Sequence, residues 1–180
     1  MALKSTIYKA ELAISDMDRG YYQTHSLTLA QHPSETLERM MLRVAVFARH
    51  AHEALVFTKG ISSTDEPDLW QKSLSDEIEL WIDLGQPDEK RIRKACGRAR
   101  EVWIYCYGRA APVWWQQEGK TLKRFANLNV AYVGAESMEQ LGACAQRTMD
   151  LQCTIQDGEL CLIAGDTTVT LQLDVWQSVG

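Results

Sequence analysis

The densest group of side chains that could do chemistry lies between Asp65 and Asp83. The segment DEPDLWQKSLSDEIELWIDLG holds seven carboxylates and one lysine. Carboxylates crowded onto adjacent strands repel one another, so water, neighbouring Arg and Lys side chains or a divalent metal ion must offset the repulsion. The next segment, Pro87 to Arg100, carries six Lys and Arg against two acids. An acidic segment is therefore followed directly by a basic one.

Three of the acids are candidates to share a metal ion. Asp83 lies near the carboxyl end of a predicted strand, where open α/β sheets place their ligands. Asp68 stands at the head of the preceding predicted strand, so a hairpin would bring both carboxylates to one ion. Mg²⁺ suits such a site because it takes oxygen ligands and keeps several waters. Glu38, on a predicted helix, is positioned to lean over the sheet edge towards the two aspartates, whereas Glu35 is expected to point away.

The elements that must position these acids follow from hydrophobic periodicity and turn residues. We predict a hairpin of 3–14 and 21–30, a helix opening at 32–35, strands 54–59, 68–72 and 78–84, a helix 87–99, a strand 102–107, a short helix 112–117, a strand 125–133, a helix 136–146, and strands 147–156, 159–163 and 167–175. The central order is helix, strand, strand, strand, helix, strand. The crossover at 78–107 implies a parallel pair. The predicted fold class is α/β (mixed α+β): a central mixed sheet with an N-terminal hairpin and a C-terminal β-meander.

Bulk composition predicts one globular domain spanning residues 1–180. The chain is 46% hydrophobic and 24% charged, with a net charge of −5. No apolar run is long enough for a signal peptide or a membrane span, so we expect a cytoplasmic protein that does not enter a membrane. The negative charge argues against a general nucleic-acid coat, although the basic segment 87–100 remains a local exception.

Several familiar sites are excluded by residue type or spacing. Gly119-Lys120-Thr121 lacks the glycine that a phosphate loop requires at position 114, where Trp114 stands. No dinucleotide fingerprint, hydrolase elbow or histidine metal pattern occurs. The five cysteines show no metal-like spacing, which favours reduced and mostly buried thiols, with one reactive thiol as the alternative.

Several longer motifs resemble those of a small bacterial family. The segments are HPSETLERMMLR (32–43), DEPDLW (65–70), LWIDLGQPDEKRIRKA (80–95), VWWQQ (113–117), FANLNV (125–130) and RTMDLQCTIQDG (147–158). Together they span nearly the whole chain and look like the YaeQ family. That resemblance implies a variant of the PD-(D/E)xK fold of restriction-type nucleases, with which the predicted order of elements agrees.

The resemblance also implies roles for individual residues. Active members of the wider superfamily hold Mg²⁺ with a helix Glu, the Asp of Pro-Asp and the acid of (D/E)-x-K, which correspond here to Glu38, Asp68 and Asp83. Gly85 stands where the motif lysine belongs. A cation from the next helix, Arg91 or Lys94, is expected to reach back over the strand end in its place.

Two classes of function follow. The first is a Mg²⁺-dependent phosphodiesterase acting on nucleic acid, with Asp83, Lys94 and Arg91 as catalytic residues. The second is a non-catalytic binding or regulatory module that retains the nuclease fold and has nucleic acid or a protein as its partner. Trp114 and Trp115 could form a stacking or docking surface for that partner, and core packing is the alternative for both.

Overall fold

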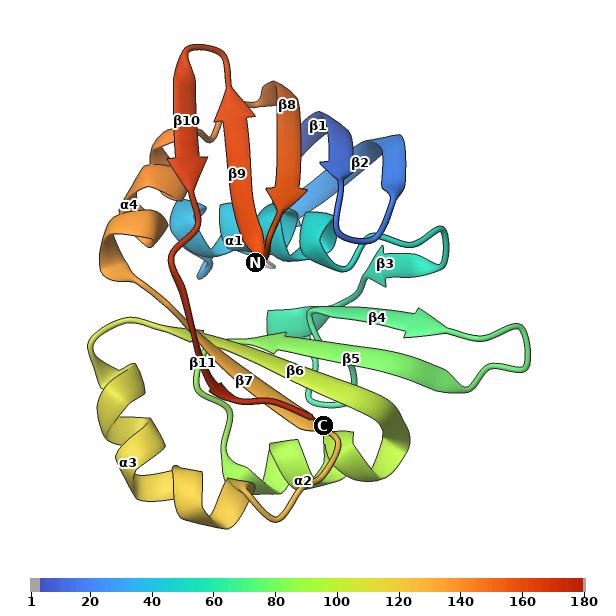
Figure 1. The fold of residues 1–180 in the computed structure, drawn as a ribbon, viewed down its shortest axis with the longest axis vertical. Coiled ribbons are helices and arrows are strands. Elements are labelled where there is room, and N and C mark those ends of the chain that lie inside the picture. The colour runs from blue at the N-terminus through green and yellow to red at the C-terminus, as the bar shows by residue number, and fades with distance from the viewer. Residues whose placement is uncertain (1–3, 180) are drawn as a thin grey trace. The chain divides into compact units, whose positions relative to one another are not determined.

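The computed structural model describes residues 4–179, and the chain divides into two compact units. Unit 1 consists of Met1–Ala51 and Glu136–Gln172, and unit 2 of His52–Ala135 and Leu173–Gly180. Each unit contains its own sheet (Figure 1). Among the described residues, no helix combines the length and apolar character that crossing a membrane requires.

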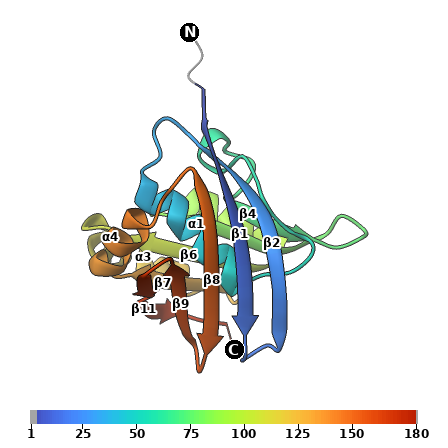
Figure 2. The same cartoon turned by 90° about the horizontal axis from the view of Figure 1, so that it is seen from above.

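The sheet of unit 1 joins strands from residues 6–31 to strands from residues 148–170. Its strands are β1 (Thr6–Asp16), β2 (Tyr21–Gln31), β8 (Thr148–Gln156), β9 (Glu159–Ala164) and β10 (Thr167–Thr170), in the order β10-β9-β8-β1-β2. The predicted N-terminal hairpin and the strands of the meander are confirmed. In the structure the hairpin and the meander belong to one sheet, because β1 and β8 are parallel neighbours (Figure 2). The sequence did not predict this pairing.

Two helices, α1 (Leu37–Arg49) and α4 (Ala135–Ala143), accompany this sheet. The Thr36 hydroxyl caps α1 by accepting a hydrogen bond from the Arg39 amide at 3.1 Å, so the helix begins after the predicted opening at 32–35. Every residue of α1 from Met40 to Ala48 is buried, so this part of the helix is covered on all sides. The helix ends at Arg49, and Leu55 begins the next strand, within the predicted strand 54–59.

The sheet of unit 2 contains β3 (Leu55–Phe57), β4 (Leu69–Lys72), β5 (Ile78–Leu84), β6 (Ala99–Tyr107), β7 (Leu128–Val133) and β11 (Leu173–Gln177), in the order β11-β7-β6-β5-β4-β3. The pairs β5–β6 and β6–β7 are parallel and the others antiparallel. The chain order α1, β3, β4, β5, α2 (Glu89–Arg98), β6 matches the predicted order, and the predicted mixed α+β class is confirmed.

The core of unit 2 lies between its sheet and the helices α2 and α3 (Ala110–Leu122). Ile92 of α2, Leu122 of α3 and Trp81 of β5 are fully buried there. The predicted short helix 112–117 is thus one part of a longer helix. Trp114 and Trp115 pack against the same core, which supports core packing over a free stacking surface.

A further prediction requires correction. The predicted strand 167–175 is two strands, because the amide of Gln172 donates to the Ser137 hydroxyl at 2.8 Å instead of continuing the ladder. In β5, Trp81 and Asp83 lie on the face opposite Ile82. All three side chains are buried, so both faces of β5 are covered near its carboxyl end.

Candidate functional site at the end of strand β5

Asp83 is held at the end of β5 by the guanidinium group of Arg91. Arg91 Nε donates to Asp83 Oδ2 at 2.9 Å, and Arg91 Nη2 donates to Oδ1 at 3.0 Å. The Trp81 indole N–H also donates to Oδ2, at 3.1 Å. The Asp83 side chain is only 3% exposed, so this paired geometry offsets the cost of burying its charge.

Arg91 also binds the loop that precedes β4. Its Nη2 donates to the carbonyl of Glu66 at 2.9 Å, and its Nη1 to the carbonyls of Thr64 at 3.2 Å and Ser63 at 3.5 Å. The hydrogen bond with Asp83 is the main cause that raises the pKa of Arg91. A guanidinium group therefore sits in a cage of five oxygens and ties the loop to the end of the sheet.

Arg91 reaches this cage because of its place on α2. The Asp88 carboxylate caps the helix and accepts from the Arg91 amide at 2.8 Å. Arg91 therefore lies in the first turn, directly after the crossover from β5. A cation from this helix was expected to reach back over the end of β5, and in the structure Arg91 does so.

Asp68 is brought next to Asp83 by the pairing of β4 with β5. The antiparallel register places Leu69, the first residue of β4, opposite Ile82, and Asp68 directly precedes it. The Asp68 amide donates to the carbonyl of Ile82 at 3.0 Å, and its Oδ2 accepts from the Leu84 amide at 2.8 Å. The side chain is buried. The predicted juxtaposition of these two aspartates thus exists within unit 2.

Gly60 gives Asp68 the space that it occupies. Gly60 has a φ of +47°, and a Cβ atom there would lie 2.4 Å from Asp68 Oδ1. A larger residue would displace the carboxylate.

Lys94 contacts a different acid. Its ammonium group lies 2.7 Å from Asp65 Oδ1, and both side chains are largely exposed. The hydrogen bond from Lys94 is the main cause that lowers the pKa of Asp65. Of the two cations predicted to serve Asp83, Arg91 is the one that the structure pairs with it.

Glu38, the third predicted ligand, belongs to unit 1, whereas Asp68 and Asp83 belong to unit 2. Its side chain lies against α4, where a Cβ atom on Gly142 would approach Glu38 Cγ to 2.7 Å. The structure therefore brings two of the three predicted carboxylates together within one unit.

The buried acid at the start of α1 is Glu35, which sequence reasoning expected to point away. Glu35 Oε2 accepts from Arg39 Nη1 at 2.7 Å and from Arg43 Nε at 3.0 Å, and its Oε1 accepts from Arg43 Nη2 at 2.7 Å. Arg39 and Arg43 are four residues apart on α1 and so lie on one side of the helix, and Glu35 directly precedes the capping residue Thr36. That pattern was visible in the sequence and could have revealed the cluster.

The residues around Asp83 do not fit a Mg²⁺ centre as they are arranged. Both Asp83 oxygens already accept from Arg91, and one Asp68 oxygen accepts from a backbone amide. Mg²⁺ requires open oxygen ligands in octahedral geometry, and a guanidinium in contact with the carboxylate repels a second cation. Across residues 4–179, no group of three His, Cys, Asp or Glu side chains is placed to hold a metal ion.

Arginine and lysine side chains offset much of the acidic segment's charge. Besides Asp83–Arg91 and Asp65–Lys94, the structure pairs Glu79 with Arg100 at 3.4 Å. Three partners thus come from α2 or the residues just after it, which explains why the acidic and basic segments are consecutive. A cavity of about 460 Å³ adjoins α2 and is lined by Thr64, Asp88, Lys90, Arg91 and Lys94.

Burial makes several of the cysteines poor candidates for a reactive centre. Cys106, Cys144 and Cys153 are buried, and Cys96 and Cys161 are partly buried. Burial raises the pKa of Cys96 to about 11 and the pKa of Cys106 and Cys153 to about 12. Thiols with such values stay protonated at neutral pH and are poor nucleophiles.

Comparison with known proteins agrees with this architecture. The family model described as YaeQ protein matches residues 1–173. The chain belongs to the YaeQ family. YaeQ proteins of Salmonella typhi and Escherichia coli (strain K12) are each 48% identical to it over 178 residues, covering 98% of both chains.

Solved YaeQ structures share the fold. The crystal structure of YaeQ from Xanthomonas axonopodis pv. citri superposes with a TM-score of 0.93 at 50% identity, covering 97% of this chain and 99% of the other. YaeQ from Pseudomonas syringae gives a TM-score of 0.92 at 35% identity, with 97% of both chains covered. The two-sheet architecture is therefore that of the YaeQ family.

Proposed function

We propose that this YaeQ protein is a non-catalytic module that binds the phosphodiester backbone of nucleic acid through the exposed side of α2. The observation that carries this proposal is the Arg91–Asp83 pair, with contacts of 2.9 and 3.0 Å. Arg91 supplies the positive charge that a metal ion would supply to Asp83. The proposal includes descent from the PD-(D/E)xK nucleases, with the fold kept and the metal chemistry lost.

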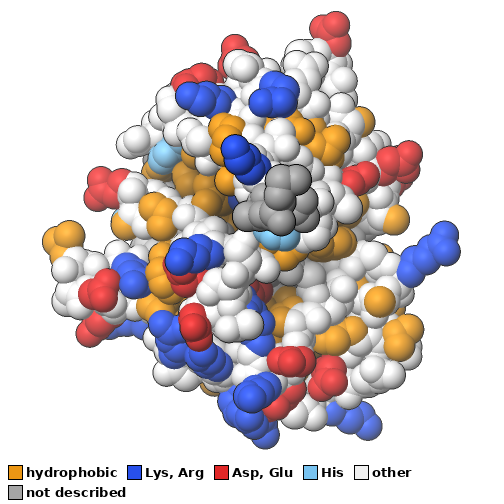
Figure 3. Space-filling view, turned by 180° about the vertical axis from the view of Figure 1, so that it is seen from behind, with side chains coloured by type: hydrophobic (Ala, Val, Ile, Leu, Met, Phe, Trp, Pro, Cys, Tyr) orange, Lys and Arg blue, Asp and Glu red, His pale blue; other side chains and the backbone are white. Residues whose placement is uncertain are grey.

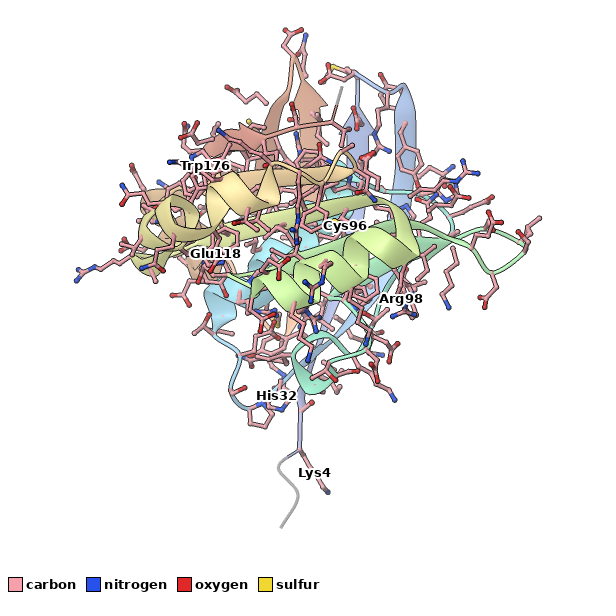
Figure 4. The ribbon with its side chains drawn as sticks, turned by 90° about the horizontal axis from the view of Figure 1, so that it is seen from below. Lys4, His32, Cys96, Arg98, Glu118 and Trp176 are labelled. Atoms are coloured by element: carbon pink, nitrogen blue, oxygen red, sulfur yellow. The ribbon has the colours of Figure 1, made fainter. Side chains whose placement is uncertain are left out.

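The cations of α2 support binding to phosphate. Lys90, Lys94 and Arg98 follow one another at intervals of four residues and are exposed, so they form a ridge along one side of the helix. Figure 4 shows Arg98 near the end of this helix. Arg93 and Arg100 are exposed as well. Such a ridge suits contacts that position a backbone without reading its bases.

The charge of unit 2 is compatible with an anionic partner. This unit carries twelve Lys and Arg against thirteen Asp and Glu, and several of the acids are already paired with cations. Figure 3 shows Lys and Arg side chains gathered on the lower part of one face, with carboxylates among them. The acids among the cations predict weak binding that is sensitive to salt.

The test measures fluorescence anisotropy of labelled single- and double-stranded DNA and RNA over a range of salt concentrations. The variant Lys90→Gln/Lys94→Gln removes two cations from the ridge. Each lost phosphate contact reduces the slope of log K against log salt by about 0.7 to 0.9, so we expect a reduction of about 1.5. The matched control, Lys4→Gln/Lys9→Gln, removes the same charge from unit 1. Absence of binding at low salt, or an equal loss in the control, contradicts the proposal.

A Mg²⁺-dependent phosphodiesterase is the second candidate, and the binding of the Asp68 carboxylate to the amide of Leu84, the residue that follows Asp83, favours it. It requires Arg91 to leave the Asp83 carboxylate and so expose the two acids. The same nucleic acids are therefore incubated with Mg²⁺ or Mn²⁺ and examined for cleavage. Cleavage that disappears in Asp83→Asn would replace the binding proposal with this one. Intact substrate favours the non-catalytic module.

A further inference from the structure

The outer edge of the unit 1 sheet is formed by β2. Among the described residues, β2 pairs with β1 alone, and its position at the end of the strand order leaves its other side unpaired with any strand. The β1–β2 register runs without a shift from Asp16 opposite Tyr21 to Thr6 opposite Gln31. An eleven-residue edge strand presents alternate backbone N–H and C=O groups outward.

The sequence of β2 lacks the features that usually protect an edge. YYQTHSLTLAQ contains no Asp, Glu, Lys, Arg, Pro or Gly. Native proteins discourage pairing at exposed edges with such charges, with proline, with bulges or with very short strands. Tyr22 is 61% exposed, and Thr24, Ser26 and Thr28 are exposed on the same side. These residue types also favour strand pairing.

The other three edge strands, β10, β3 and β11, have features that discourage pairing with a further strand. Strand β10 has four residues and β3 has three. Strand β11 has an irregular register between Val175 and Gln177 and bears Asp174. The contrast identifies β2 as the edge on which another strand can pair over a substantial length.

We propose that β2 is a self-association edge, at which the β2 strands of two copies of this chain pair antiparallel. A two-fold axis near Ser26 sets Thr24 of one copy opposite Thr28 of the other. Opposite residues of an antiparallel pair share a face, so the side bearing Leu27 and Leu29, which are buried, continues across the junction. Opposed threonines form favourable cross-strand pairs, and no charged residue of either strand faces another.

A second copy fits this edge because the strand is complementary to itself. One end is already engaged, since Arg43 Nη2 donates to the carbonyl of Ala30 at 3.2 Å. The stretch from Gln23 to Thr28 is therefore the part that the pairing uses. The two copies each carry a net charge of −5, so they repel at long range although the paired strands are uncharged. Salt screens that repulsion, and self-association should strengthen as salt rises.

This salt dependence is opposite in sign to that of nucleic-acid binding, so the two proposals can fail separately. Sedimentation velocity over a range of protein concentrations, at low and high salt, measures the association of the full chain. We expect a monomer–dimer equilibrium that shifts towards the dimer at high salt. A monomer at every concentration and salt overturns the proposal.

The variant Thr24→Lys/Thr28→Lys places like charges opposite each other twice in the proposed pair. We expect it to weaken association about ten-fold. The matched control, Gln152→Lys/Gln156→Lys, adds the same charge to exposed positions of β8, an interior strand of the same sheet. Equal weakening by both variants would place the interface elsewhere and overturn the proposal.

Hydrogen exchange on the unmodified protein gives a test that does not depend on the variants folding. Backbone amides of β2 should gain protection at high protein concentration, whereas those of the edge strand β10 should not. Association without added protection in β2 contradicts the proposal.

Discussion

Glu35 in unit 1 and Asp83 in unit 2 are both buried carboxylates held by guanidinium groups, but the two clusters are built differently. The Glu35 cluster is local, since Arg39 and Arg43 follow Glu35 at intervals of four residues. Arg91 instead joins a strand, a helix and a loop. The side chain of Arg43 is 8% exposed and that of Arg91 is 24% exposed.

The difference separates a closed structural cluster from one that borders a cavity. Burial of Arg43 and Glu35 means that neither charge can turn to water when its partner is lost. Arg91 lines the cavity beside α2, so water or a small cation can approach its position. We therefore expect loss of Arg91 to lower the free energy of unfolding less than loss of Glu35 does.

The largest effect is expected for Glu35→Ala. This change leaves buried guanidinium charge without its carboxylate and should lower the free energy of unfolding by about 4 kcal/mol. Urea denaturation measures the change, and Glu139→Ala, an exposed position of α4, is the control. An effect no larger than that of the control would show that the closed cluster has no special structural role.

A smaller effect is expected for Arg91→Ala, which leaves the Asp83 carboxylate without its guanidinium group. Water entering from the adjacent cavity limits the expected loss to about 2 kcal/mol. Low concentrations of guanidinium ion should recover part of the stability of this variant and none of that of Glu35→Ala, as thermal unfolding can measure. Arg91→Lys keeps the charge but loses the paired geometry, so it should lie between the wild type and Arg91→Ala. The absence of any selective recovery would contradict the cavity argument.

The smallest effect is expected for Lys94→Ala. The Lys94–Asp65 pair is exposed, so solvent screens it and the free energy of unfolding should not change measurably. A double-mutant cycle with Asp65→Ala checks this by chemical denaturation. A strong coupling that persists at high salt would mean that the acidic segment is stabilised at its surface as well as at Asp83.

The elements of unit 2 could be predicted well because their signals are local. The alternation in β5, the break at Gly85 and the cap at Asp88 each act within a few residues, and they place α2 directly after β5. The approach of Asp68 to Asp83 followed from a hairpin between neighbouring strands. The sequence predicted either Arg91 or Lys94 as the partner of Asp83, and only the three-dimensional structure could decide between them.

Other features depend on tertiary contacts that periodicity does not reveal. The parallel pairing of β1 with β8 joins segments at opposite ends of the sequence. The break between β10 and β11 depends on a hydroxyl of α4, Ser137. Glu38 resembled a ligand by motif, but its packing against Gly142 depends on how α4 approaches α1.

The pairing of β1 with β8 also has a consequence for biosynthesis. Ala10 lies opposite Met149, so the β1–β2 hairpin leaves the ribosome without its neighbour β8, which is translated much later. Closing so long a loop is slow and exposes nascent strands in the meantime. We therefore expect the amino-terminal hairpin to be the segment most dependent on chaperones while synthesis is under way.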